Sequence, residues 1–235
     1  MNPTLRLRLL NTWRWIWRTF SVLFVLQLIY ILLLRFVDPP VTTTQISRWW
    51  NGEGFTRDYV DWDEISVNMK LAVIASEDQM FPFHDGFDWK SITKAAEKNK
   101  VSKRTRGAST ISQQVAKNVF LWQGRSYFRK ALEVYFTFMI EATWGKRRIL
   151  EVYLNVAETG KGTFGVEAAA RKDFNKPASK LSQTEAAMIA ASLPNPRKYT
   201  VKPLSNYVAG HYGHVVQQMN NLIGVPEIAD LVKAD

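Results

Sequence analysis

The feature that most restricts how this chain can fold is an apolar run near its N-terminus, Phe20–Leu34, which three weakly polar residues interrupt. Taking in Ile16 and Phe36–Val37 gives about 20 residues, enough for a helix to span the roughly 30 Å hydrocarbon core of a bilayer. A proline pair, Pro39-Pro40, ends the segment. We therefore predict a transmembrane signal anchor over residues 19–37. The alternatives are a buried core helix and a cleaved signal peptide, although no small-x-small cleavage site follows the run.

Charges around this run predict its orientation. Four arginines precede it, at positions 6, 8, 14 and 18, and no acid appears before Asp38. Because positively charged flanks tend to stay in the cytoplasm, residues 1–18 are predicted to form a cytoplasmic tail. Everything from about residue 39 onward is then expected on the outer face of the membrane.

The composition of the 235-residue chain limits which kinds of site and partner it can have. There is no cysteine, which excludes disulfides, thiol catalysis and cysteine-based metal sites. The formal charge of +10 implies an anionic partner, which could be nucleic acid, acidic lipid headgroups or a phosphorylated substrate. Much of the tryptophan lies near the N-terminus, which favours a membrane interface. We therefore expect contact with the membrane and no nucleic-acid partner.

Beyond residue 60, hydrophobic spacing predicts a domain of the mainly α class. Expected helices cover residues 66–76, 88–98, 111–120, 127–144, 146–157, 166–174, 182–193 and 205–222. Capping boxes are predicted at Thr110–Gln113 and Ser182–Glu185. Residues 38–60 form a polar, membrane-proximal lead-in without clear periodicity, residues 99–107 a basic surface loop, and residues 160–165 a glycine-rich loop. No segment has a strand pattern, so residues 61–235 are predicted to form one helical domain.

A pair of acids follows a buried-type segment near the start of this domain. The run Leu71–Ser76 leads directly into Glu77 and Asp78. Burial, and the negative end of a helix dipole, would both raise the pKa of Glu77, which suits a carboxylate that moves protons near neutral pH. The competing interpretation is an ordinary solvated helix end.

The helix predicted over residues 127–144 carries only two polar residues in its central ten positions, so we expect it in the middle of the domain. One of the two is Glu133, and a buried carboxylate must pair, be protonated or face a cleft. Arg129 and Lys130 lie four and three residues before it, within reach on a helix. The sequence therefore allows two interpretations of Glu133: a structural ion pair with these cations, or a catalytic acid.

A third stretch, Gly107–Asn118, combines a helix N-terminus rich in hydroxyls and amides with Lys117 two turns along. Helix N-termini bind phosphate readily, and Lys117, Arg125 and Arg129 could complete a diphosphate site. A plain capped helix is the alternative.

Together these stretches resemble the ordered motifs of one family, the peptidoglycan glycosyltransferases, which includes the transglycosylase module of class A penicillin-binding proteins. The resemblance covers about Val60 to Tyr199. Ser112 and Asp173 depart from the threonine and the aromatic residue usual in the family. The motifs are Glu77-Asp78-x-x-Phe81-x-x-His84-x-Gly86, Gly107-x-Ser109-Thr110-Ile111-x-Gln113-Gln114 with Lys117-Asn118, Arg129-Lys130-x-x-Glu133, and Arg148-Ile149-Leu150-Glu151-x-Tyr153-Leu154-Asn155.

The resemblance implies a lysozyme-like helical domain with a small membrane-proximal subdomain, which polymerises lipid II during cell-wall synthesis. It implies Glu77 as the general base, Glu133 as a second essential carboxylate, and Lys117 and Arg125 as the cations that hold the donor diphosphate. Further substrate-binding residues would be Ser109, Thr110, Gln113, Gln114, Asn118, Arg129 and Lys130. The turn that aims the base would be shaped by Asp78, Phe81, His84 and Gly86.

The same resemblance implies a single-pass protein of the bacterial inner membrane with a periplasmic catalytic domain. Its partners would be lipid II, the growing undecaprenyl-diphosphate-linked glycan, and proteins of cell-wall synthesis or division. No cofactor is required by the sequence, and no metal ligands are predicted with certainty, although Mg²⁺ or Mn²⁺ at the diphosphate would be compatible with the chemistry.

Two other functions fit the same sequence features. A lytic glycosidase on a lysozyme-like fold would also use carboxylates, but it would have no diphosphate to hold. A non-catalytic, basic, membrane-tethered binding protein would explain the charge and the anchor, and would not need Glu77.

Overall fold

The structure is a computed structural model that describes residues 3–101, 109–124 and 126–233. The chain separates into two compact units, Met1–Asp38 and Pro39–Asp235. The first contains a single helix, and the second contains the other described helices and strands.

The helix of the first unit is α1 (Pro3–Leu34). Within it, Asn11–Leu34 is long and apolar enough to cross a membrane, and an 18-residue window of this stretch has a mean hydropathy of 1.9. The helix begins well before the span predicted over residues 19–37, because no helix breaker follows Pro3 and proline is well tolerated in the first turn. It ends before Phe36, which lies in a turn, and Val37, which lies in a bend.

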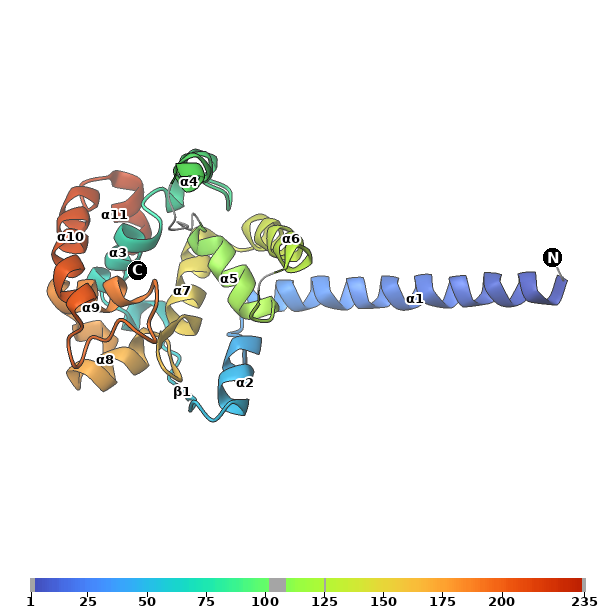
Figure 1. Cartoon of the computed structure of the whole chain (residues 1–235), viewed down its shortest axis with the longest axis horizontal. Coiled ribbons are helices and arrows are strands. Elements are labelled where there is room, and N and C mark those ends of the chain that lie inside the picture. The colour runs from blue at the N-terminus through green and yellow to red at the C-terminus, as the bar shows by residue number, and fades with distance from the viewer. Residues whose placement is uncertain (1–2, 102–108, 125, 234–235) are drawn as a thin grey trace. The chain divides into compact units, whose positions relative to one another are not determined.

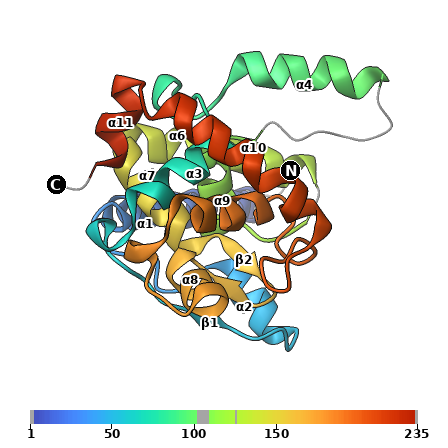
Figure 2. The same cartoon turned by 90° about the vertical axis from the view of Figure 1, so that its left-hand side faces the viewer.

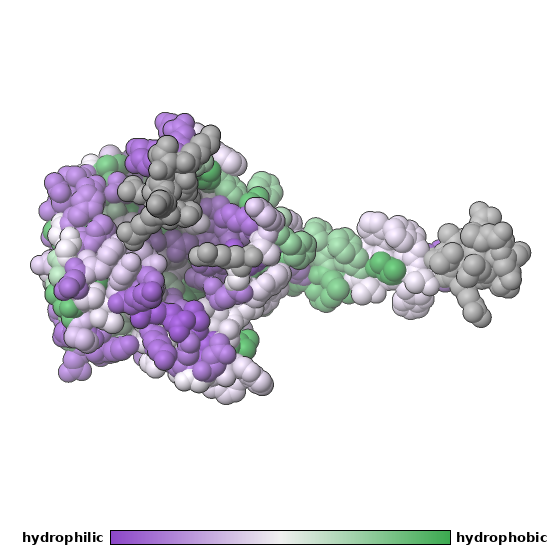
Figure 3. Space-filling view, in the orientation of Figure 1, coloured by the Kyte–Doolittle hydropathy of each residue, from purple (hydrophilic) through white to green (hydrophobic). Residues whose placement is uncertain are grey.

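The second unit is mainly helical, as predicted (Figures 1 and 2). Its helices are α2 (Thr43–Trp50), α3 (Val67–Glu77), α4 (Trp89–Val101), α5 (Ile111–Phe120), α6 (Tyr127–Thr143), α7 (Lys146–Val156), α8 (Val166–Phe174), α9 (Gln183–Ser192), α10 (Asn206–Leu222) and α11 (Pro226–Val232). Short 3₁₀ turns occupy Trp62–Glu64, Phe81–Phe83 and Ala178–Lys180. The viewer-facing surface of this unit in Figure 3 is mostly hydrophilic, in keeping with the high charge of the chain.

The core of the second unit is built around α3 and α7. Every residue of α3 from Met69 to Ala75 is buried, and the helix packs against α9 and α10. On α7, buried residues run from Ile149 to Val156 with only Glu151 partly exposed, and α5 packs against both α6 and α7. The sequence run that leads to Glu77 therefore forms one of the central helices.

The prediction that the helix around Glu133 lies in the middle of the domain is wrong. The buried residues of α6 are Glu133, Thr137 and Ile140, whereas Phe128 and Phe138 are 68% and 64% exposed. The helix lies at the edge of the unit, and its polar stripe, Glu133 and Thr137, faces inward. A helix that is apolar nearly all round can be buried or face an apolar surrounding, and spacing alone does not distinguish these cases.

A small three-stranded sheet was not predicted. Strands β1 (Thr56–Arg57), β2 (Glu158–Gly160) and β3 (Thr163–Phe164) lie in the order β1-β3-β2. The β1–β3 pair is parallel and the β2–β3 pair is antiparallel with an irregular register. Strands of two or three residues are too short to show an alternating pattern, and the glycine-rich stretch that we predicted as a loop forms the β2–β3 hairpin.

The lead-in predicted over residues 38–60 contains helix α2 and strand β1, neither of which was predicted. Both pack onto the rest of the second unit, α2 against α5 and β1 against β3. Arg48 of α2 also forms an ion pair with Glu158 of β2, with an Nη2–Oε2 distance of 3.2 Å. Residues 43–57 of this segment are thus packed as part of the second unit.

The predicted helix starts are largely confirmed. Capping boxes are present at Thr110–Gln113 and Ser182–Glu185, and the Asp88 side chain accepts a hydrogen bond from the Ser91 amide at 3.0 Å. Helix α4 continues to Val101, into the predicted 99–107 loop; residues 102–107 of that loop lie outside the described residues. Helix α11 was not predicted.

Candidate active site

Glu77 is the last residue of α3, and its carboxylate is the chemical centre of the site. Its Oε2 atom accepts a hydrogen bond from Nε2 of Gln114 on α5 at 2.8 Å. Burial raises the pKa of Glu77; the neighbouring Asp78 raises it further, while the Gln114 hydrogen bond and Lys117 oppose the shift. The predicted direction of this shift is confirmed, with burial as its main cause.

The loop that follows Glu77, residues 78–86, is held by hydrogen bonds from its own side chains. Both carboxylate oxygens of Asp78 lie 3.1 Å from Nε2 of His84, and Oδ2 also accepts from the Ile111 amide at 3.0 Å. The Gly86 amide donates to Nδ1 of His84 at 3.1 Å. The side chain of Phe81, a residue of this loop, is completely buried. These contacts join the loop to the N-terminus of α5, which carries Gln114.

Tyr153 of α7 orients Gln114. Its hydroxyl donates to Oε1 of Gln114 at 3.3 Å, so the amide presents its Nε2 donor to Glu77. Tyr153 is 2% exposed, and burial raises the pKa of its hydroxyl well above the ordinary value. From the sequence, Tyr153 was expected only as part of a motif, with no role in the site.

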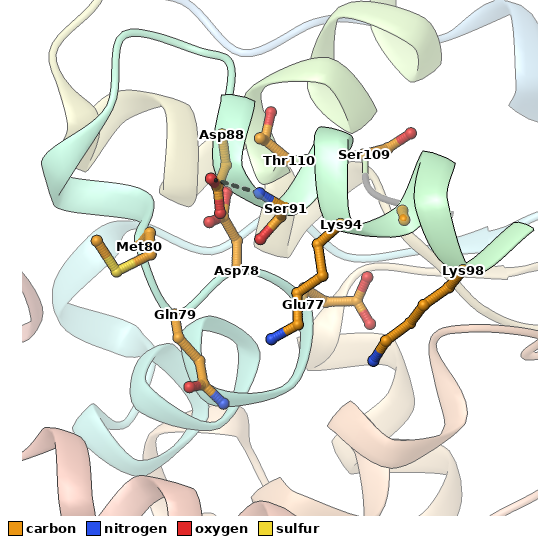
Figure 4. A pocket seen from close by; sticks show the side chains of 11 residues that line it. Glu77, Asp78, Gln79, Met80, Asp88, Ser91, Lys94, Lys98, Ser109 and Thr110 are labelled. Carbon is orange, nitrogen blue, oxygen red and sulfur yellow. Dashed lines mark hydrogen bonds between the residues drawn. The ribbon is translucent and has the colours of Figure 1, made fainter. Parts of the chain in front are cut away.

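A pocket of about 400 Å³ opens beside Glu77 (Figure 4). Figure 4 shows Lys94 and Lys98 extending from α4 into the space beside the Glu77 carboxylate. Neither lysine was predicted as a site residue, because both lie on an otherwise ordinary amphipathic helix. The lining residues are Glu77, Asp78, Gln79, Met80, Asp88, Ser91, Lys94, Ala95, Lys98, Ser109 and Thr110. We call this space the Glu77 pocket.

A second pocket, of about 180 Å³, lies on the Gln114 side and is called here the Lys117 pocket. Burial lowers the pKa of Lys117, and the nearby charge of Glu133 opposes that shift. The second pocket thus contains a partly desolvated cation. Its lining residues are Thr44, Gln114, Lys117, Asn118, Gln123, Tyr153, Ala157, Glu158, Leu193, Pro194 and Pro196.

Glu133 is paired, as its spacing predicts. Its Oε2 lies 2.8 Å from Nη1 of Arg129 and its Oε1 lies 2.5 Å from Nζ of Lys130. Glu133 is 3% exposed, while the Lys130 side chain is 47% exposed. The buried carboxylate therefore fixes two cations on the face of α6 that is electrostatically coupled to Lys117. Arg125, the remaining predicted cation, lies outside the described residues.

The predicted substrate-binding residues on and just before α5 lie in two different pockets, except for Gln113, which belongs to a helix cap. Ser109 and Thr110 line the Glu77 pocket, while Gln114 and Asn118 line the Lys117 pocket. Gln113 lines neither pocket, because its Oε1 accepts from the Thr110 amide at 3.0 Å to close the capping box. Thr110 also donates its hydroxyl to the Gly86 carbonyl at 2.7 Å.

Glu77 has a raised pKa and lines the Glu77 pocket, and it is hydrogen-bonded to Gln114, which lines the Lys117 pocket. Its carboxylate can therefore take a proton from a hydroxyl held in the Glu77 pocket. Lys117 in the second pocket, together with Arg129 and Lys130, which are electrostatically coupled to it, can stabilise an anionic leaving group. The arrangement is therefore suited to a group transfer with an activated hydroxyl as the nucleophile.

Comparison with known proteins gives the family. Residues 43–220 match the family described as Transglycosylase. The chain is 46% identical over 218 residues to a biosynthetic peptidoglycan transglycosylase of Xanthomonas campestris, covering 90% of this chain and 89% of the relative. Proteins of the same description from Pseudomonas putida and Yersinia pseudotuberculosis are 48% identical over 230 residues and 49% identical over 229 residues. These alignments cover 95% and 94% of this chain, and 94% and 95% of the relatives. The chain therefore belongs to the transglycosylase family, among the biosynthetic peptidoglycan transglycosylases.

Proposed function

We propose that this peptidoglycan glycosyltransferase polymerises lipid II into linear glycan strands, with Glu77 as the general base. The 4-hydroxyl of an incoming lipid II gives its proton to Glu77, and its oxygen bonds to the anomeric carbon of the growing chain with inversion. The bond from that carbon to the phosphate oxygen breaks, and its electron pair leaves with undecaprenyl diphosphate. The observation that carries the proposal is the Glu77–Gln114 hydrogen bond, which joins a carboxylate of raised pKa to the cationic Lys117 pocket.

Glu77 has the environment that a base needs. Because burial raises its pKa, the carboxylate accepts a proton near neutral pH more readily than a solvated glutamate would. The Gln114 amide, oriented by Tyr153, donates to Oε2 of Glu77, and Oε1 would take the proton of the acceptor hydroxyl. The acceptor sugar would lie in the Glu77 pocket, where Ser109 supplies a further hydroxyl.

The leaving diphosphate would lie among Lys117, Arg129 and Lys130, with Arg125 as a further ligand. Burial disfavours the charged form of Lys117, so an arriving diphosphate would stabilise the ammonium charge and form a strong charge-assisted hydrogen bond with it. Glu133 would orient Arg129 and Lys130 toward the diphosphate. Asn118, which lines the same pocket, would bind a polar group of the donor.

The residues near the diphosphate site do not by themselves fit a bound metal ion. Both carboxylate oxygens of Glu133 are engaged by Arg129 and Lys130. Among the described residues, no group of three or more His, Asp or Glu side chains could hold a metal. Mg²⁺ or Mn²⁺ would have to be held by diphosphate oxygens, and we assign it no step.

Helix α1 supplies the membrane attachment in this proposal. Asn11–Leu34 is long and apolar enough to span a bilayer, and the arginines before it favour a cytoplasmic N-terminus. The enzyme would then be a single-pass inner-membrane protein with residues 61–235 as a periplasmic catalytic domain and residues 38–60 as its membrane-proximal part. Proteins of cell-wall synthesis or division would be its partners.

Incubation of the full-length protein with lipid II in detergent or vesicles tests the proposal. We expect long glycan strands and released undecaprenyl diphosphate, and a loss of about 100- to 10,000-fold in rate for Glu77→Gln, with an unchanged circular dichroism spectrum. Substantial activity in Glu77→Gln would refute its assignment as the base. Cleavage of preformed peptidoglycan without polymer synthesis would instead support a lytic glycosidase.

A further inference from the structure

A largely buried pair of charged side chains, Lys146 and Glu141, contacts the 78–86 loop through Lys146 and has no place in the mechanism above. We propose that the two are positioning residues that hold this loop against α5 and so keep Glu77 in register with Gln114. Neither residue lines the Glu77 pocket or the Lys117 pocket. The inference rests on the proposed function only in taking Glu77 as the base.

Lys146 joins the loop directly to α6. Its Nζ donates to the carbonyl of His84 at 2.5 Å and to Oε1 of Glu141 at 2.7 Å. The same Nζ lies 4.7 Å from the centroid of the Phe81 ring, within range of a cation–π interaction. The ammonium group thus contacts the loop through a backbone carbonyl and through the side chain of Phe81.

Glu141 extends the connection to α5. Its Oε1 accepts a hydrogen bond from the hydroxyl of Ser112, two residues before Gln114. The loop is therefore linked to α5 through Lys146, Glu141 and Ser112, in addition to the direct bonds from the Ile111 amide to Asp78 and from the Thr110 hydroxyl to the Gly86 carbonyl. Gln114, which contacts Glu77, lies on the segment of α5 that these bonds hold.

The location of this pair disfavours a purely stabilising role. Lys146 is the first residue of α7, where the positive end of the helix dipole repels a cation. The side chains of Lys146 and Glu141 are 21% and 9% exposed, so both charges are largely desolvated. Ion pairs of this kind are often no more stabilising than apolar residues of similar volume. The pair does provide a donor at the His84 carbonyl, which an apolar pair would leave unsatisfied.

Loss of the Lys146 ammonium would free the His84 carbonyl and loosen the loop, so the Glu77–Gln114 geometry would vary. Since misplacement of a catalytic group by about 1 Å can cost up to about 100-fold in rate, we expect Lys146→Met to lower kcat by about 10- to 100-fold. KM for lipid II should change less than about twofold, because no substrate contact is removed.

The experiment compares Lys146→Met with Arg147→Met in the full-length protein. Arg147 is the next residue on α7, and its guanidinium makes an ion pair with Asp63 at 3.9 Å, away from the loop. We expect Arg147→Met to keep normal kcat. Hydrogen–deuterium exchange should rise in the amides of residues 78–86 in Lys146→Met, and remain normal in α10.

A double variant, Lys146→Met with Glu141→Gln, separates positioning from stability. It removes the unpaired buried carboxylate, so thermal stability should return toward the wild-type value while kcat stays low. Normal kcat in the double variant, or unchanged exchange of the loop in Lys146→Met, would overturn the proposal. If Lys146→Met fails to fold, the double variant decides alone. Wild-type protein that makes no polymer would refute the proposed function, whereas the exchange measurement would still test the positioning role.

Discussion

Replacing Gly86 with alanine measures how tightly the loop behind Glu77 packs on α6. Gly86 has a φ angle of +87°, and a Cβ added there would lie 2.7 Å from Cγ2 of Thr137 and 3.0 Å from Cγ of Glu141. The left-handed backbone costs alanine about 1–2 kcal/mol. Inserting a methyl group into a packed site adds about 1–3 kcal/mol. We therefore expect Gly86→Ala to lower the free energy of unfolding by about 2–5 kcal/mol.

Thermal unfolding of the full-length protein in detergent, followed by circular dichroism, measures this effect. For a domain of this size, about 1 kcal/mol shifts Tm by about 2–4 °C, so Gly86→Ala should lower Tm by roughly 4–20 °C. Because Thr137 and Glu141 border the loop, polymerisation should also fall at temperatures where the variant is folded.

Gly210→Ala is the matched control. Gly210 lies within α10, and a Cβ there would meet nothing within 4 Å, so alanine should stabilise the helix by up to about 1 kcal/mol. A loss below about 1 kcal/mol in Gly86→Ala, or equal effects at the two positions, would refute the packing argument.

Three further predictions concern the site itself. Because burial raises the pKa of Glu77, the folded protein loses stability when this carboxylate ionises, at a pH above that pKa. The loss is about 1.4 kcal/mol for each factor of ten by which folding lowers the acid dissociation constant of Glu77. Glu77→Gln should therefore have a higher Tm than wild type at pH 8, and the difference should shrink as the pH falls below that pKa; an equal Tm at pH 8 would contradict this. Tyr153→Phe removes the bond that orients Gln114 and should lower kcat by about fivefold, equivalent to about 1 kcal/mol, measured by lipid II turnover; an unchanged rate would show that Gln114 needs no such partner. Lys117→Ala should lower kcat/KM by roughly 10- to 100-fold, whereas the exposed Lys180→Ala should have no effect; equal rates would place the diphosphate elsewhere.

Local sequence signals predicted much of the helical framework because their causes lie within about four residues. Helix α5 has the predicted bounds, and its Thr110–Gln113 capping box is present. The pairing of Glu133 with Arg129 and Lys130 also follows from helix spacing alone. The end of α3 at Glu77 was predicted to within one residue. In each case, the interacting groups are neighbours on one helix.

Contacts between distant parts of the chain were accessible only from the tertiary structure. Gln114 and Glu77 are 37 positions apart, and Lys146 and His84 are 62 apart. No spacing rule relates such residues, since their approach depends on how α3, α5 and α7 pack. The polar stripe of α6 faces inward for the same reason, because the face a helix buries is chosen by its neighbours. The sequence alone thus predicted a raised pKa for Glu77 and left a solvated helix end as the alternative, while packing determined which amide Glu77 contacts, which pockets it adjoins and which lysine binds its loop.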